Sequence, residues 1–187
     1  MRRDQLEHAI RTACQIIGHE AVVVVGSQSI LGSFAEDELP QEATMSIEID
    51  ILPLVDDGDE TARLADLIEG VAGEWSPFEE QHGFSIDGVD LETAVLPNGW
   101  RGRLVKVQNA NTAAAAGEPQ YIGWCLGKED LCVAKLCAFR EKDQNFVAAL
   151  LDAGLVDAEV IAKRLLEVPM KHHSSAQSAL AWLAAKG

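Results

Sequence analysis

With 187 residues, the chain is long enough to bury a sizeable core as one domain or as a domain with a helical extension. Its net charge of −15 argues against non-specific binding to DNA or RNA, because that binding depends on basic side chains at the phosphates. The longest apolar run is only strand length and the N-terminal segment lacks a signal peptide's apolar core, so we expect a cytoplasmic protein without a membrane partner.

The first predicted elements are a helix and a buried strand. Apolar residues at helical spacing predict a helix over Arg3–Gly18, and the β-branched run Ala21–Val25 predicts a strand at the centre of a sheet. The strand stops at a Gly-Ser pair, after which Ser27–Phe34 is predicted as a short helix capped by Ser27. Free backbone N–H groups at such a helix start suit a bound phosphate. The candidate nucleotide-binding residues here are Gly26, Ser27, Gln28 and Ser29.

The next predicted strand carries two acidic side chains. The acidic, Pro-containing segment Ala35–Ala43 is expected to be a loop, and Thr44–Val55 is expected to be a strand with clean alternation. Because strand side chains alternate between faces, Glu48 and Asp50 share one face.

The middle of the chain is predicted to contain a helix and further strands. Thr61–Ala72 has a helical pattern, and Phe84–Leu96 is predicted as a hairpin or two short strands broken at Asp87-Gly88. The second arm of that hairpin would place Asp90 and Glu92 on one face. A strand over Leu104–Val107 and a surface loop over Asn109–Pro119 follow.

The character of the chain changes after Gly127. Four helices are predicted from apolar spacing: Lys128–Phe139, Gln144–Ala153, Asp157–Glu167 and Ser174–Ala185. We therefore expect an α+β or α/β core over residues 1–125 and a helical region over 126–187, packed as one compact unit. The four cysteines lack CxxC spacing and are expected to be buried thiols in a reducing compartment.

The paired acids indicate a metal site. Converging carboxylates repel one another and are usually held by a cation, commonly magnesium bridging substrate phosphates. Glu48 and Asp50 are the candidate metal ligands, and a third catalytic acid would come from Asp90 or Glu92. The same spacing fits the solvated face of an edge strand equally well.

A second candidate cluster contains Lys135, Arg140, Lys142 and Asp143, at the end of a predicted helix. Its cations could reach a triphosphate whose metal is held by the acids. In the sequence alone, a charged junction between two helices, with Lys135 extending past the core to solvent, is the simpler interpretation.

Together these residues resemble the nucleotidyltransferase fold of the polymerase-β-like superfamily. The resemblance lies in Val25-Gly26-Ser27 followed by Glu48-Ile49-Asp50. More narrowly, the chain is similar to DUF6036-type nucleotidyltransferases, which are relatives of the AbiEii-type toxins of toxin–antitoxin systems. That similarity covers nearly the whole chain through the segments GSQSILGSF, SIEID, LPNGWRGRL and CLGKEDLCVAKLCAFREKDQNFV.

The resemblance implies an α+β fold with a mixed sheet flanked by helices and followed by a C-terminal helical region. By likeness, Gly26 and Ser27 would cradle the phosphates of an NTP, Glu48 and Asp50 would bind Mg²⁺, and Lys135, Arg140 and Asp143 would match a helical motif of the toxin relatives. It implies nucleotide transfer to a hydroxyl of RNA or protein, and an antitoxin partner.

Two departures from the pattern leave alternatives open. The gap between Gly26-Ser27 and Glu48 is longer than usual in the superfamily, and the first acid is Glu instead of the commoner Asp. One alternative is a non-catalytic binding or interaction module with the nucleotidyltransferase fold. Another is a protein-interaction domain whose acidic surface binds a basic partner.

Overall fold

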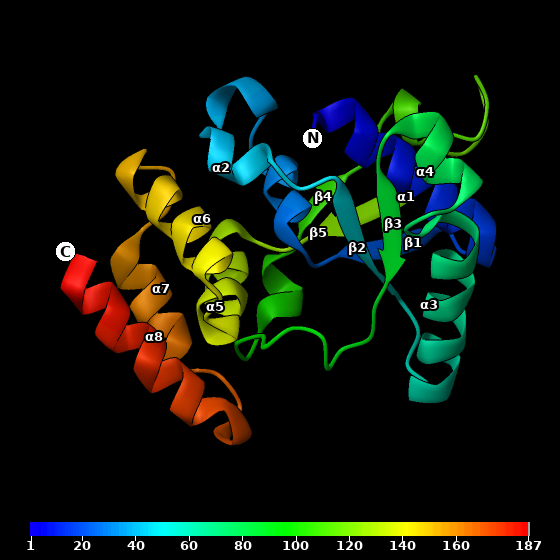
Figure 1. The fold of residues 1–187 in the computed structure, drawn as a ribbon. Helices are drawn as coiled ribbons and strands as arrows, with labels where there is room; N and C mark the ends of the chain where they lie inside the picture. Colours follow the sequence, from blue (N-terminus) through cyan, green and yellow to red (C-terminus); the bar gives the residue numbers. More distant parts are fainter. Residues whose placement is uncertain (187) are drawn as a thin grey trace.

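A computed structural model describes residues 1–186 and contains a five-stranded mixed sheet (Figure 1). The strands are β1 (Ala21–Val24), β2 (Glu48–Pro53), β3 (Ser85–Gly88), β4 (Val105–Val107) and β5 (Ile122–Cys125). Their order is β3-β2-β1-β5-β4, so β1 lies at the centre. It pairs antiparallel with β2 and parallel with β5, while β2–β3 is parallel and β4–β5 is antiparallel. The predicted α+β class is confirmed.

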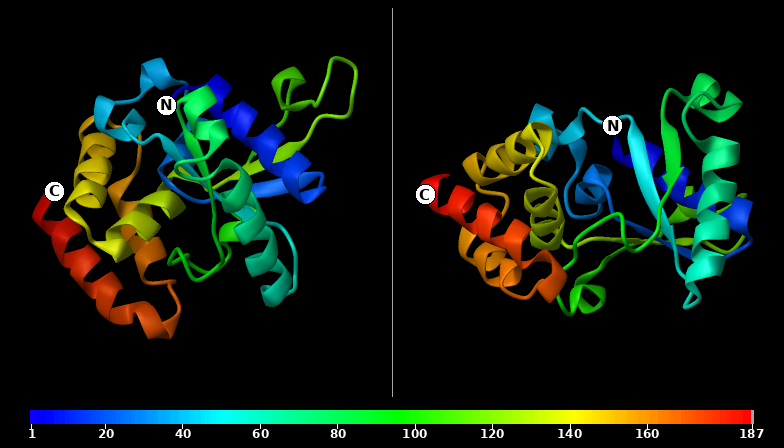
Figure 2. Two further views of the ribbon diagram at one scale, coloured as in Figure 1. Left: turned by 45° about the vertical axis from the view of Figure 1, so that its right-hand side comes forward. Right: turned by 60° about the horizontal axis from the view of Figure 1, so that its bottom comes forward.

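Helices lie on two sides of this sheet. The N-terminal half contributes α1 (Arg3–Ile17), α3 (Gly58–Ala72) and α4 (Pro77–His82). The C-terminal third contributes α5 (Lys128–Ala138), α6 (Glu141–Asp152), α7 (Ala158–Leu165) and α8 (His173–Lys186). Every view places α5–α8 together, on the side of the sheet away from α3 and α4 (Figures 1 and 2). Several of the candidate residues, from β2, α5 and α6, line one pocket between the sheet and the group α5–α8.

Two glycines allow the N-terminal helices to approach the sheet closely. A Cβ atom at Gly123 of β5 would overlap the side chain of Ile10 in α1. A Cβ atom at Gly88 of β3 would overlap the backbone of Ala65 in α3. The buried faces of both helices therefore rest directly on the strands. Apolar burial of this kind contributes about 25 cal/mol per Å² and is the main source of the fold's stability.

The sequence predicted most of the helices and most of the strands, but it missed α4 (Pro77–His82) and β5. Helical spacing correctly located α1, α3 and α5–α8 to within a few residues. In contrast, β2 is shorter than Thr44–Val55, and β5 was not predicted at all. The segment Ala35–Ala43 is not a plain loop, because it contains a 3-10 turn over Glu36–Glu38 and the start of α2 (Gln41–Thr44).

Two local predictions at candidate residues were wrong. The segment Phe84–Leu96 forms β3 and then a turn, in which the Asp90 carboxylate accepts the backbone N–H groups of Glu92 and Thr93. These hydrogen bonds stabilise a turn in place of a second strand. The 3-10 helix η1 (Ser27–Gly32) begins after Gly26, and the Ser27 side chain does not cap it.

All four cysteines are buried free thiols, as the sequence predicted. Burial raises the pKa of Cys14 and of Cys125 to about 12, so these thiols stay protonated at neutral pH. Within residues 1–186, no helix has both the length and the apolar character needed to cross a membrane.

Candidate nucleotide site

The sheet brings Gly26 and Asp50 together although they are far apart in the sequence. The Val25 N–H donates to the Asp50 carbonyl at 3.1 Å, which extends the β1–β2 pairing to the end of β1. A Cβ atom at Gly26 would overlap Asp50 Oδ2. The Asp50 carboxylate therefore lies directly against the Gly26 backbone, in space that only glycine leaves free.

A third acid, Asp87, lies beside Asp50 on the neighbouring strand. The parallel register of β2 and β3 pairs Asp50 with Asp87 and Glu48 with Ser85. Asp87 Oδ1 is buried, and no described residue hydrogen-bonds to it. Sequence reasoning missed Asp87 because the Asp87-Gly88 pair resembled a turn.

These carboxyl groups are electrostatically unfavourable in the protein alone. Burial raises the pKa of Asp87 to about 6, and the nearby Glu48 and Asp50 carboxylates add to the effect. Burial also raises the pKa of Asp50; Lys135 opposes this shift, and Glu48 reinforces it. Carboxyl groups with raised pKa values gain stability when a cation binds beside them.

The opposite wall of the site is the junction between α5 and α6, where one carboxylate holds two cations. Lys135 Nζ lies 3.1 Å from Asp143 Oδ1. The Arg140 guanidinium donates to both Asp143 oxygens, with Nε–Oδ2 at 2.6 Å and Nη2–Oδ1 at 3.3 Å. Phe139 connects the helices in a left-handed conformation, with φ of 57°. This turn brings the residues on either side of it together.

Asp143 is the buried centre of this cluster, with a side chain only 1% exposed. Burial alone would raise its pKa, but the hydrogen bonds from Arg140 and the charge of Lys135 outweigh burial and lower the pKa. The carboxylate therefore stays ionised and fixes the positions of both cations. The sequence alone favoured a charged junction at the surface, whereas the structure shows a buried carboxylate that pairs with both cations.

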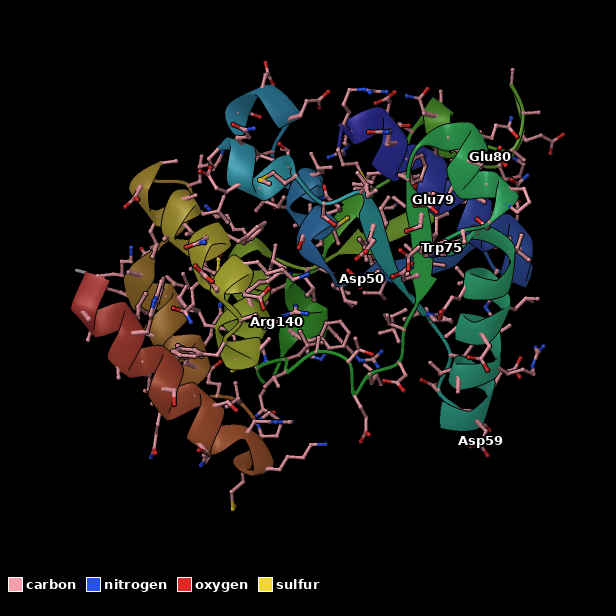
Figure 3. The ribbon with its side chains drawn as sticks, viewed as in Figure 1. Asp50, Asp59, Trp75, Glu79, Glu80 and Arg140 are labelled. Atoms are coloured by element: carbon pink, nitrogen blue, oxygen red, sulfur yellow. The ribbon has the colours of Figure 1, made fainter. Side chains whose placement is uncertain are left out.

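The two walls enclose a pocket of about 500 Å³. In Figure 3, Asp50 on β2 and Arg140 at the start of α6 lie on opposite sides of it. The predicted residues that line it are Ser27, Glu48, Asp50, Lys135, Arg140, Lys142 and Asp143. The long segment between Gly26 and Glu48 adds Glu42, Ala43, Met45 and Ile47 to the lining. That insertion therefore builds part of the pocket.

Other predicted site residues lie elsewhere. Gln28 and Ser29 are fully buried, and Gln28 Nε2 donates to the Ser46 carbonyl at 3.3 Å, so it links η1 to the chain entering β2. Asp90 and Glu92 are exposed and do not line the pocket. Glu92 instead lies 3.6 Å from Lys171. The structure thus brings Asp87, and neither Asp90 nor Glu92, next to Asp50.

The acids could hold a magnesium ion as a pair of carboxylates completed by substrate phosphates and water. Within residues 1–186, no three His, Cys, Asp or Glu side chains are grouped as a ready-made metal site. Mg²⁺ in phosphate-transfer sites is usually held by one or two carboxylates together with substrate phosphates and water. Glu48 and Asp50 can supply such a pair, and the raised pKa of Asp50 agrees with a place for a cation.

The class of protein follows from comparison with known families: the chain is a nucleotidyltransferase by family. Over residues 4–183 it matches DUF6036, described as a nucleotidyltransferase of unknown function, and it belongs to that family. No curated protein and no solved structure matches the chain. The narrower resemblance to AbiEii-type toxins stays a prediction.

Proposed function

We propose that this protein transfers a nucleotide from an NTP to a hydroxyl group of RNA or protein in a Mg²⁺-dependent reaction. The observation that carries the proposal is one pocket in which Glu48 and Asp50 face Lys135 and Arg140. Acids on one wall and fixed cations on the other suit a metal-bound triphosphate, whose charges need both.

The residues of the chain have separate roles in this proposal. Lys135 and Arg140 bind phosphate oxygens, and Asp143 positions these two cations. Ser27, at the start of η1, lies where backbone N–H groups can contact a phosphate. Glu48 and Asp50 would hold Mg²⁺, which when bound would neutralise phosphate charge and lower the pKa of the acceptor hydroxyl. Asp87 lies next to Asp50 on β3 and does not itself line the pocket.

The acceptor hydroxyl attacks the α-phosphorus of the NTP. A bond forms between the hydroxyl oxygen and this phosphorus, the bond to the β-phosphate oxygen breaks, and pyrophosphate leaves. The hydroxyl proton passes to solvent or to a carboxylate of the site. The cations of the α5–α6 wall stabilise the negative charge that develops on the leaving pyrophosphate.

The test is transfer of label from an α-³²P-labelled NTP to RNA or protein acceptors in the presence of Mg²⁺. We expect Asp50→Ala to abolish transfer, whereas Asp152→Ala, at the exposed end of α6, should keep it. Transfer that is unchanged in Asp50→Ala would sink the assignment. Tight NTP binding by calorimetry without turnover on any acceptor would favour a non-catalytic nucleotide-binding module.

The resemblance to AbiEii-type toxins extends the proposal to a toxin role, with an antitoxin as partner. Induced expression should then arrest bacterial growth, and Asp50→Ala should relieve the arrest at equal protein level. Growth that is equally slow with both proteins would remove the link between the site and toxicity.

A further inference from the structure

A separate surface, on the α3–α4 side of the sheet, has the features of a docking site. Three large apolar side chains follow one another along and just beyond α3: Leu67, Val71 and Trp75, which are 39%, 49% and 78% exposed. Residues four apart in a helix share a face, so Leu67 and Val71 form an apolar stripe, and Trp75 follows it. Tryptophan is one of the residue types enriched at binding hot spots.

The turn at Trp75 is held by hydrogen bonds to the side chains of Glu79 and Ser76. Its φ of 65° is left-handed, a conformation that bulky residues rarely adopt, so some other interaction must stabilise it. The Trp75 N–H donates to the Glu79 carboxylate at 2.7 Å, and the Ser76 hydroxyl accepts from the Glu79 N–H at 3.2 Å. The turn is therefore fixed while the indole remains in solvent (Figure 3).

Beside Trp75 lies an open hollow of about 580 Å³. Gly70 forms part of its wall, and a Cβ atom there would meet nothing within 4 Å, so packing within the chain does not require glycine. Glycine inside a helix lowers helix stability relative to alanine. What Gly70 does provide is a shallower helix surface next to the indole.

The charge of this surface selects the partner. The hollow is lined by Asp66, Glu69 and Glu74, and none of the described residues that line it is basic. The nearby Arg63 is already paired with Glu60 at 2.7 Å. Phosphate backbones and anionic membranes would be repelled. A second copy of a chain with net charge −15 would bring the same acids to the contact.

We propose that Leu67, Val71, Trp75 and the adjoining acidic hollow bind an amphipathic, basic segment of a partner protein. Apolar side chains of the segment pack on the stripe and the indole, and its Lys or Arg side chains pair with Asp66, Glu69 and Glu74. The surface lies away from the α5–α6 wall (Figure 3), so the proposal stands independently of nucleotide transfer.

The test uses a synthetic amphipathic Lys/Leu peptide, a Glu/Leu control peptide and protein labelled with 5-fluorotryptophan. The chain has four tryptophans, so Trp100, Trp124 and Trp182 serve as internal controls, and Trp75→Phe assigns the Trp75 signal. We expect the Lys/Leu peptide to shift only the Trp75 ¹⁹F signal and the Glu/Leu peptide to shift none. An unmoved Trp75 signal, or one that moves with protein concentration alone, overturns the proposal.

Charge-matched variants separate this surface from net charge. Asp66→Lys combined with Glu74→Lys should weaken binding of the Lys/Leu peptide by about tenfold or more. Glu118→Lys combined with Asp152→Lys makes the same change in net charge at exposed positions elsewhere and should preserve the affinity. Gly70→Leu should weaken binding while the protein stays folded by circular dichroism. Equal losses in the two double variants overturn the proposal.

Discussion

On the acidic wall of the pocket, Glu48 and Asp50 come from β2, and Asp87 lies next to Asp50 on β3 without lining the pocket. Within residues 1–186 none of these three acids forms an ion pair with a basic side chain. On the α5–α6 wall, Lys135 and Arg140 share one buried carboxylate. The pKa values of Asp50 and Asp87 are raised, whereas the pKa of Asp143 is lowered. A cation bound beside Asp50 would therefore stabilise the acidic wall. On the α5–α6 wall, Asp143 already holds Lys135 and Arg140 in position without a ligand.

The largest effect on this difference between the two walls is expected when the charge of Asp143 is removed. Asp143→Asn leaves two cations without their buried partner, and we expect the free energy of unfolding to fall by about 3 kcal/mol. Nucleotide transfer should fall more than about hundredfold, because Lys135 and Arg140 are no longer positioned. Urea unfolding and label transfer measure the two effects. Asp152→Asn on the same helix is the control; equal stability of the two variants would contradict a structural role for the cluster.

Gly26→Ala tests the position of the Asp50 carboxylate and leaves every acid in place. The backbone at Gly26 is extended, so alanine fits its conformation, and only the overlap of the new methyl group with Asp50 is at issue. Displacing this carboxylate should lower transfer by about hundredfold. Gly102→Ala, where a Cβ meets nothing within 4 Å, is the matched control. Full activity in Gly26→Ala would mean that the position of Asp50 is unimportant.

Asp87 tests whether an unpaired carboxylate beside Asp50 lowers the free energy of unfolding. Its pKa is about 6 in the folded protein and lower when unfolded, so between about pH 4 and 6 the native state binds more protons than the unfolded state. Stability should therefore fall as pH rises through this window. Asp87→Asn should reduce that fall, since only the contribution of the raised Asp50 pKa remains, and the variant should be more stable at pH 7 by roughly 1 kcal/mol after allowance for solvent screening of a partly buried group.

Urea unfolding in EDTA across pH 4 to 8 measures this difference. The sign is informative, because most substitutions at a buried site destabilise. A variant that is less stable at pH 7 and keeps the wild-type pH dependence would show that Asp87 is compensated in some other way. Asp90→Asn, on the exposed turn nearby, should leave the pH dependence unchanged.

The smallest effect is expected at Lys142. This side chain is exposed and lines the pocket, but among the described residues it forms no ion pair. Lys142→Ala should raise the apparent KM for NTP about two- to fivefold, more at low salt, with little change in kcat. Lys163→Ala, exposed on α7, is the control. A large loss of kcat would contradict this and would show that Lys142 acts on the reacting phosphates, as proposed for Lys135 and Arg140.

Sequence periodicity predicted the parts of this fold that depend on local pattern. Strand alternation, a local rule, places Glu48 and Asp50 on one face, and both line the pocket together with Ser27. Gly26 lies against Asp50 because β1 pairs with β2, which is a contact between distant segments. The grouping of Lys135, Arg140 and Asp143 was also suggested, although their contact depends on the left-handed turn at Phe139. Nothing in a single sequence indicates that a phenylalanine will adopt that conformation.

What the sequence did not predict depends on register between distant strands. Strand β5 is only Ile122–Cys125, and Gly123 interrupts its apolar residues, so it gave little signal before its pairing with β1 was known. Asp87-Gly88 has the composition of a turn, yet Gly88 is needed where α3 approaches β3. Only the pairing of β3 with β2 brings Asp87 beside Asp50.

The hydrogen bond from the Val25 N–H to the Asp50 carbonyl has a consequence for how long the acidic wall persists. It lies beside the central strand, where opening requires separation of β1 from β2. Amide hydrogens in such places exchange only on sub-global or global unfolding, whereas helix junctions near the surface open far more often. The alignment of Gly26 with Asp50 should therefore last as long as the folded molecule itself, through many cycles of ligand arrival and departure.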